Sequence, residues 1–333
     1  MFAVLSRTRR GRLLRGAAAV VVLLGLVVWW LLPIGASSPS GAVTFSTGVT
    51  SGVYQRYGSL LKEDLGRDLP EVSIELMTSE GSQQNLARVA SGEADFTVAT
   101  ADAVAKYQED GKPGAGRLRG CARLYDDYVQ LVVAKDSKIG SVAGLRGKKV
   151  GVGQEGSGVR LIADRVMTAA KLDPKHDITP VPAGIDTMPD LLQRGELDAF
   201  FWSGGLPTGA VTLLWQRYDI RLVPLDPDLI SRLHASGEAA SRYYRSTVIP
   251  ADAYGAAQNG TAISTVAVAN LLVTTDRMDA ALTEGFTRTV IDSRDRIGKE
   301  VHPAQLVDLR TAIYTAPLRL HDGAKRYYQS VKP

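Results

Sequence analysis

The sequence is poor in the residue types that most often carry metal and redox chemistry. It has 333 residues but one cysteine, Cys121, and four histidines. A single cysteine excludes an internal disulfide and any cysteine-rich zinc or iron–sulfur site. The histidines are scattered along the chain, and none stands in an H-E-x-x-H pattern. We therefore expect no cofactor and no bound metal.

Acidic residues are absent from the start of the chain, where the first is Glu63. Five arginines lie within residues 1–15, and without them 34 Lys and Arg residues face 35 Asp and Glu residues. The sequence pI of about 9.1 thus comes from this leader rather than from the body of the protein. A nucleic-acid-binding body has no support in this composition.

The leader also contains the longest apolar run, 17 residues from position 16 to 32. This is longer than the core of a usual signal peptide, about 7–15 residues, and at the lower edge of the roughly 17–25 residues that span a bilayer. We predict a basic cytoplasmic region over residues 1–15 and a signal anchor or signal peptide over residues 16–36. The positive-inside rule then places the body outside the cytoplasm. It is either held at the cell membrane by one helix, the alternative that we favour, or secreted or periplasmic after cleavage.

The body alternates short β-rich runs with helical patterns, which is typical of an α/β fold with a mostly parallel sheet. Strands are expected at 43–48, 72–79, 95–100, 128–136, 148–153, 178–183, 197–204, 221–225 and 264–275, and helices at 53–68, 82–91, 157–171 and 188–193. Because single hydrophobic cores rarely exceed about 250–300 residues, we expect two lobes. Lobe 1 is predicted to comprise residues 42–130 and 268–333, and lobe 2 residues 131–267. Two crossover strands, near 128–136 and 264–275, are expected to act as hinges.

Four predicted strands end in turns rich in glycine and hydroxyl residues. These turns are V-T-S-G-V-Y (49–54), E-G-S-Q-Q-N (80–85), Q-E-G-S-G (154–158) and S-G-G-L-P (203–207). Such a turn at the start of a helix presents free backbone N–H groups, which favour an anion. Ligands of open α/β sheets bind at the carboxyl ends of the strands, so these turns predict a cleft for a small solute. The alternative is that the serines only cap helices and the glycines only turn corners.

Several segments resemble the TAXI-type solute receptors of TRAP transporters. They are S-T-G-V-T-S-G-V-Y (46–54), T-S-E-G-S-Q-Q-N-L (78–86), S-G-E-A-D-F (91–96), the stretch from D-S-K-I-G to G-S-G-V-R (136–160), G-E-L-D-A-F-F-W-S-G-G-L-P (195–207), V-I-P-A-D-A-Y (248–254) and T-V-A-V-A-N-L-L-V (265–273). The resemblance implies a two-lobed periplasmic-binding-protein-like fold of type II, preceded by the predicted N-terminal transmembrane helix. It also implies a small organic acid as ligand, for some members glutamate or a related dicarboxylate, and a TRAP-type membrane permease as partner.

Carried over residue by residue, the resemblance implies a set of ligand-binding residues. These are Thr47, Gly48, Ser51, Gly52, Tyr54, Ser79, Gly81, Ser82, Asn85, Gly156, Ser157, Gly158, Arg160, Ser203, Gly204 and Gly205. Arg160 is the candidate for a bidentate grip on a carboxylate. The chain departs from the family pattern at Glu80 and Glu155, where an inward-pointing carboxylate would repel a dicarboxylate or pair with a ligand ammonium group.

Enzymatic alternatives lack their partner residues. G-V-G-Q-E-G (151–156) matches G-x-G-x-x-G, but the next predicted strand does not end in the acidic residue that would hold a ribose. Ser59 and Lys62 form S-x-x-K without S-D-N or K-T-G elsewhere in the sequence. We therefore expect a binding protein and not an enzyme. We expect the protein to be a monomer. The alternative function is that of a membrane-tethered ligand sensor without a transport role.

Overall fold

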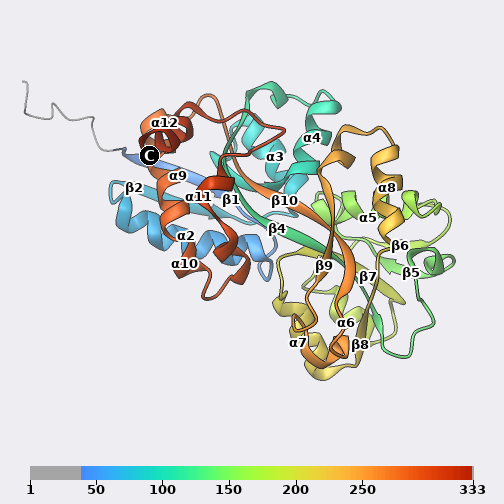
Figure 1. The fold of residues 1–333 in the computed structure, drawn as a ribbon. Helices are drawn as coiled ribbons and strands as arrows, with labels where there is room; N and C mark the ends of the chain where they lie inside the picture. The colour runs from blue at the N-terminus through green and yellow to red at the C-terminus, as the bar shows by residue number, and fades with distance from the viewer. Residues whose placement is uncertain (1–38, 332–333) are drawn as a thin grey trace, which may run out of the picture. The chain divides into compact units, whose positions relative to one another are not determined.

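The computed structural model describes residues 39–331. The predicted cytoplasmic region and the predicted signal anchor or peptide lie outside these residues. Within residues 39–331, no helix combines the length and the apolar character needed to cross a bilayer. The described chain folds into an α/β body with two lobes (Figure 1).

The first lobe is built around parallel strands, with β1 between β2 and β3. Its N-terminal elements are β1 (Gly41–Ser46), α2 (Val53–Asp68), β2 (Val72–Met77), α3 (Ser82–Ser91), β3 (Phe96–Thr100) and α4 (Ala101–Glu109). Its C-terminal helices are α9 (Ala280–Asp292), α10 (Arg294–Ile297), α11 (Leu309–Ala312) and α12 (Asp322–Ser330). Helices α2, α9 and α12 share one hydrophobic core, and α3 and α4 share another.

Apolar periodicity explains this packing. Tyr57, Leu61 and Leu65 recur every four residues on α2 and are all buried, as expected for a helix with one apolar stripe. Across the same core, Phe96 of β3 stacks on Phe286 of α9 with ring centroids 4.1 Å apart. The stripe and the stacked rings hold α2 in place, and α2 begins at the end of the loop after β1.

The second lobe repeats the parallel arrangement, with β5 between β6 and β7. Its strands are β5 (Lys149–Gly151), β6 (Thr179–Val181), β7 (Ala199–Gly204), β8 (Ile220–Val223) and β9 (Tyr244–Ile249). Its helices are α5 (Gly158–Ala169), α6 (Met188–Gln193), α7 (Gly209–Arg217) and α8 (Pro227–Ala235). One core made of side chains from these elements fills the lobe.

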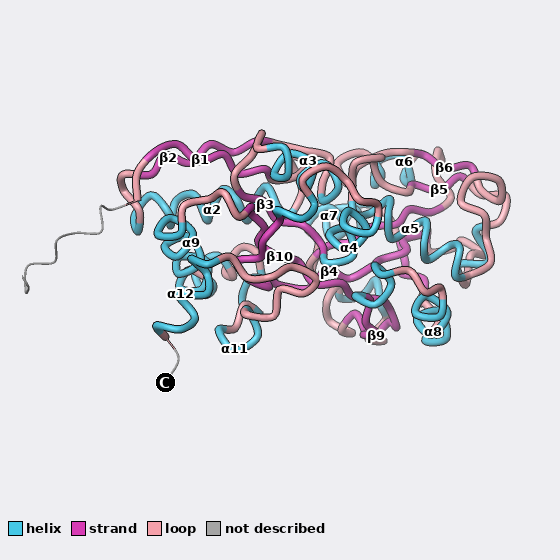
Figure 2. The backbone as a smooth tube through the Cα atoms, turned by 90° about the horizontal axis from the view of Figure 1, so that it is seen from above, coloured by secondary structure: helices cyan, strands magenta, loops and turns pink. Residues whose placement is uncertain are grey.

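Two long antiparallel strands connect the lobes (Figure 2). They are β4 (Leu118–Ala134) and β10 (Ile263–Thr275), and each contributes side chains to the cores of both lobes. They complete a ten-stranded sheet whose main order is β2-β1-β3-β10-β4-β7-β5-β6. The pairing of β10 with β4 shifts register between Ala269 and Leu271. The lobe boundaries proposed from the sequence fall within these two strands and stay a prediction.

The structure adds elements that the sequence patterns did not indicate. Strand β4 begins at Leu118, ten residues before the predicted start. Its first half was not predicted because arginines, Arg119 and Arg123, interrupt its buried residues and prevent an apolar run. Helices α4, α7 and α8 and strand β9 were not predicted either. Strands β4 and β10 run antiparallel to their neighbours, so the sheet is mixed.

Candidate functional site

A cavity of about 60 Å³ lies between the lobes, where turns from both meet. Eight of the residues predicted to bind the ligand line it: Gly48, Gly52, Tyr54, Gly81, Ser82, Ser157, Gly158 and Ser203. The first five come from the first lobe and the last three from the second. Asp127 of the connecting strand β4 lines the same cavity. We call this cavity the interlobe pocket.

Three helices begin at the interlobe pocket. Helix α2 starts at Val53, α3 at Ser82 and α5 at Gly158, and each of these residues lines the pocket. The first N–H groups of a helix have no partner within it and carry the positive end of the helix dipole. Ser157 fixes the start of α5, because its Oγ accepts a hydrogen bond from Arg160 N at 3.1 Å. The pocket is therefore suited to an anionic group.

Glycines let the two lobes approach each other beside the pocket. Gly81 has a φ of +127°, and a Cβ atom there would lie 3.3 Å from Ser157 Cα of the other lobe. The backbone N–H groups of Gln83 and Gln84 both donate to Gly156 O at 3.1 Å. These contacts join the first turn of α3 to the loop that precedes α5.

A chain of hydrogen bonds crosses the pocket wall. Tyr54 Oη lies 3.2 Å from Ser82 Oγ and donates to Asn270 Oδ1 at 2.5 Å. Asn270 Nδ2 in turn donates to Asp127 Oδ1 at 2.7 Å. Burial raises the pKa of Asp127 to about 7 from its usual 3.8, because the charged carboxylate loses hydration. Tyr54 is half-buried, and the loss of water around its hydroxyl raises its pKa.

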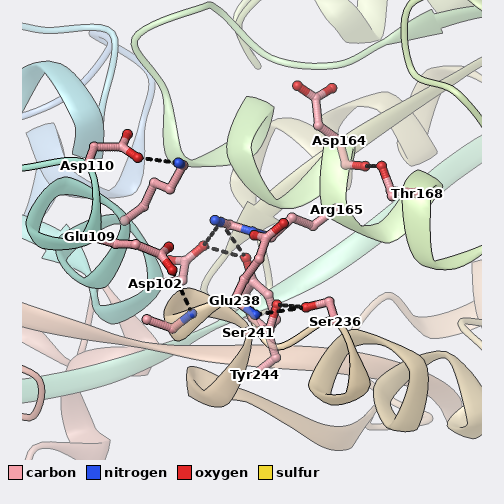
Figure 3. Close-up of polar contacts among 12 residues, drawn as sticks. Asp102, Glu109, Asp110, Asp164, Arg165, Thr168, Ser236, Glu238, Ser241 and Tyr244 are labelled. Carbon is pink, nitrogen blue, oxygen red and sulfur yellow. Dashed lines mark hydrogen bonds and ion pairs between the residues drawn. The ribbon is translucent and has the colours of Figure 1, made fainter.

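A second polar network joins the lobes away from the pocket (Figure 3). Arg165 of α5 lies between Asp102 of α4 and Tyr244 of β9. Tyr244 Oη donates to Asp102 Oδ2 at 2.7 Å and accepts from Arg165 Nη1 at 3.2 Å. Arg165 Nε also donates to Glu238 Oε2 at 2.7 Å. Asp102 and Tyr244 are about 1% exposed, so removing one partner would leave a buried polar group unsatisfied.

Other residues of the predicted set lie behind the pocket wall. Thr47 O accepts hydrogen bonds from Asn85 Nδ2 at 2.6 Å and from Ser79 Oγ at 3.1 Å. These three residues therefore tie the first glycine-rich turn to the second. Gly204 is paired within the sheet with Tyr128.

The remaining predicted residues do not line the interlobe pocket. Ser51 and Gly205 line a neighbouring cavity of about 180 Å³. Gly156 O accepts the hydrogen bonds from Gln83 and Gln84 that join the two lobes. Arg160 lies on the first turn of α5, where its Nε donates to both carboxylate oxygens of Asp164, at 2.9 and 3.1 Å. It is not among the residues that line the interlobe pocket within the described chain, and its contact with a ligand stays a prediction.

The two acidic residues at which the chain departs from the TAXI-type pattern lie in different places. Glu80 is exposed and lines the interlobe pocket. The Glu155 side chain is 85% exposed and lies 3.9 Å from the Arg160 guanidinium.

Sequence reasoning missed Asp127, the most buried charged group of the pocket. Its signal is the period-two pattern of β4, in which Tyr125, Val129 and Leu131 share its face and are all buried. An acidic residue in such a buried row needs a polar partner, which makes it a candidate for function. Trp202, Thr100 and Gln154, which also line the pocket, were missed as well.

Solved structures of similar fold come from transport systems and from a further bacterial protein. A protein from Bordetella bronchiseptica RB50 is 18% identical, with 88% of this chain and 90% of that chain covered and a TM-score of 0.51. A Listeria monocytogenes protein assigned as an L-cystine ABC transporter is 13% identical over 80% of this chain and 98% of that chain, with a TM-score of 0.50. The periplasmic aliphatic sulphonate binding protein SsuA from Escherichia coli is 17% identical over 89% and 84%, with a TM-score of 0.48.

The first two likenesses confirm the predicted two-lobed α/β fold. Of these structures, the one from Escherichia coli is named a binding protein and the one from Listeria monocytogenes a transporter. The sequence profile of the NMT1-like family matches residues 45–331. The chain therefore belongs to the NMT1-like family.

Proposed function

We propose that this protein is an extracytoplasmic solute receptor, which binds a small organic solute in the interlobe pocket and delivers it to a membrane permease. The observation that carries the proposal is the convergence of three helix N-termini, from both lobes, on one small cavity between the lobes. A solute that contacts both lobes stabilises the form in which they meet, because it binds that form better than an open one. The permease would recognise the solute-bound form.

Two finer proposals rest on the sequence resemblance to TAXI-type receptors. The first is that the permease is of the TRAP type. The second is that the solute carries a carboxylate, as glutamate and related acids do. The free N–H groups at the starts of α2 and α5 support a carboxylate. The placement outside the cytoplasm rests on the basic leader and the apolar run that follows it.

A pair of glycine substitutions tests whether the solute binds in the interlobe pocket. Gly158 is the first residue of α5, and a Cβ atom there would lie 3.1 Å from Ser82 Oγ. We expect Gly158→Val to weaken solute binding by roughly 10- to 100-fold, because the side chain crowds the meeting point of the lobes. The measurement is calorimetry of the full chain against a panel of carboxylic acids and amino acids.

The matched control is Gly209→Val. Gly209 is the first residue of α7 in the same lobe, and a Cβ atom there would meet no other atom within 4 Å. This variant should bind as the wild type does. Equal binding by both variants would contradict the proposed site, and a folded wild-type protein that binds none of a broad panel of small solutes would contradict the proposed function.

A further inference from the structure

Asp127 places a carboxylate at the junction of the lobes. The residue lies on β4, opposite Val268 of β10 and next to the register shift at Asn270. Its side chain is only 3% exposed, yet it lines the interlobe pocket. An ionised carboxylate withdrawn from water is costly unless a cation or several hydrogen bonds stabilise it.

The protein itself supplies little of that stabilisation. Among residues 39–331, the hydrogen bond to the Asp127 side chain comes from one neutral amide, that of Asn270, and it reaches Oδ1 only. Tyr54 fixes the orientation of this amide, because its hydroxyl donates to Asn270 Oδ1 and leaves Nδ2 to face Asp127. Oδ2 of Asp127 has no hydrogen-bond donor in the described part of the chain.

Two acidic residues, Asp126 and Asp102, act on Asp127 electrostatically and disfavour its ionised form. Their own ion pairs go to other residues, Asp126 to Arg123 and Arg245 and Asp102 to Arg165, and leave Asp127 without a cationic partner in the described chain. The buried Tyr125 and the half-buried Tyr54 act near it as neutral phenols, because both have raised pKa values. No Lys, Arg or His is found among the pocket-lining residues of the described chain. The ionised form of Asp127 therefore attracts a cation into the pocket.

Other groups that line the pocket favour an anion. They are the first N–H groups of α2 and α5 and the hydroxyl of Ser203, whose Oγ is buried without a hydrogen-bond partner within residues 39–331. Ser203 is 7% exposed, so its hydroxyl can be satisfied by a group inside the pocket.

Asp127 and Ser203 are close enough to contact one small molecule. Ser203 of β7 is paired with Val129 of β4, which lies two residues from Asp127 on the same face of that strand. A cavity of about 60 Å³ suits a compact solute that carries both charges.

We propose that the solute is a zwitterion of the amino-acid type, whose ammonium group binds Asp127 while its carboxylate binds the helix N-termini and Ser203. This inference rests on the proposed receptor function and specifies its substrate class. Asp127 is then the residue that distinguishes an amino acid from the same acid without its amino group.

Matched pairs of solutes test the inference on the full chain. The pairs are L-alanine and propionate, L-aspartate and succinate, and L-glutamate and glutarate, titrated separately by calorimetry. For the pair that fits the pocket, we expect the amino acid to bind at least about tenfold more tightly than its partner, because only the ammonium group pairs with a buried carboxylate. Asp127→Asn should remove this preference.

The control variant is Asp126→Asn. Asp126 is the neighbouring acid, but it pairs with Arg123 and Arg245 on the other face of β4, so this variant should keep the preference. Equal binding of both members of a pair to the wild-type protein, tighter binding of the deaminated acid, or an unchanged preference in Asp127→Asn would overturn the inference and leave the receptor function intact. A folded wild-type protein that binds no member of any pair, nor any other small solute, would instead refute the receptor function.

Discussion

Replacing Asp127 should make the protein more stable while it removes solute selectivity. Burial raises the pKa of this carboxyl to about 7 from its usual 3.8. A folded-state pKa raised by about three units means that ionising the group costs the fold up to roughly 4 kcal/mol above pH 7. The stability that the protonated group provides is fully present below the unfolded-state pKa and is lost as the pH rises toward the folded-state value. Asp127→Asn, which stays neutral at every pH, should therefore be more stable than the wild type by as much as about 4 kcal/mol near pH 8.

The assay is urea unfolding of the full chain, wild type and Asp127→Asn, without solute. The difference in unfolding free energy should be small near pH 4 and should grow until about pH 7. Asp126→Asn serves as the control, because the Asp126 side chain forms ion pairs with Arg123 and Arg245 and does not line the pocket. A variant that is less stable than the wild type near pH 8, or a difference that does not change with pH, would show that Asp127 is not an uncompensated buried carboxylate.

Three further predictions follow from the same contacts. Affinity for a zwitterion should fall about 30-fold between pH 8 and pH 5.5, because only the ionised form of Asp127, with its pKa of about 7, pairs with an ammonium group; a flat calorimetric profile would contradict this. Ser203→Ala should weaken binding by roughly three- to tenfold and raise the unfolding free energy of the solute-free protein by about 1 kcal/mol, because it removes a buried hydroxyl that has no partner in the described chain; unchanged affinity would contradict this. Tyr244→Phe should lower the unfolding free energy by about 1–3 kcal/mol, because Asp102 and Arg165 both lose a buried hydrogen bond; an unchanged urea midpoint would contradict this.

Local patterns were sufficient to predict the elements that begin at the pocket. Helix α2 occupies Val53–Asp68 and α3 occupies Ser82–Ser91, as predicted from apolar spacing and the preceding glycine-rich turns. The same turns indicated Ser82, Ser157 and Ser203, which line the pocket. Helix starts and tight turns depend on nearby residues, so their signals are present in short stretches of sequence.

Features that depend on distant segments were not predictable in this way. The first half of β4 has no apolar run, and its strand conformation depends on pairing with β10, about 150 residues later. Asp127 acquires its partner Asn270 through that pairing, so neither residue suggests the contact alone. Arg160 illustrates a local signal that was overlooked, since an acid four residues later on the same helix, Asp164, is a natural ion-pair partner.

The central claim is that a small zwitterionic solute binds between the lobes. The most direct test is a crystal structure of the full chain grown with the amino acid that binds most tightly in calorimetry. We expect the solute in the interlobe pocket, with its nitrogen within about 3 Å of Asp127 Oδ2 and its carboxylate at the first N–H groups of α2 or α5. An interlobe pocket without the solute, or a solute whose carboxylate faces Asp127, would contradict the account.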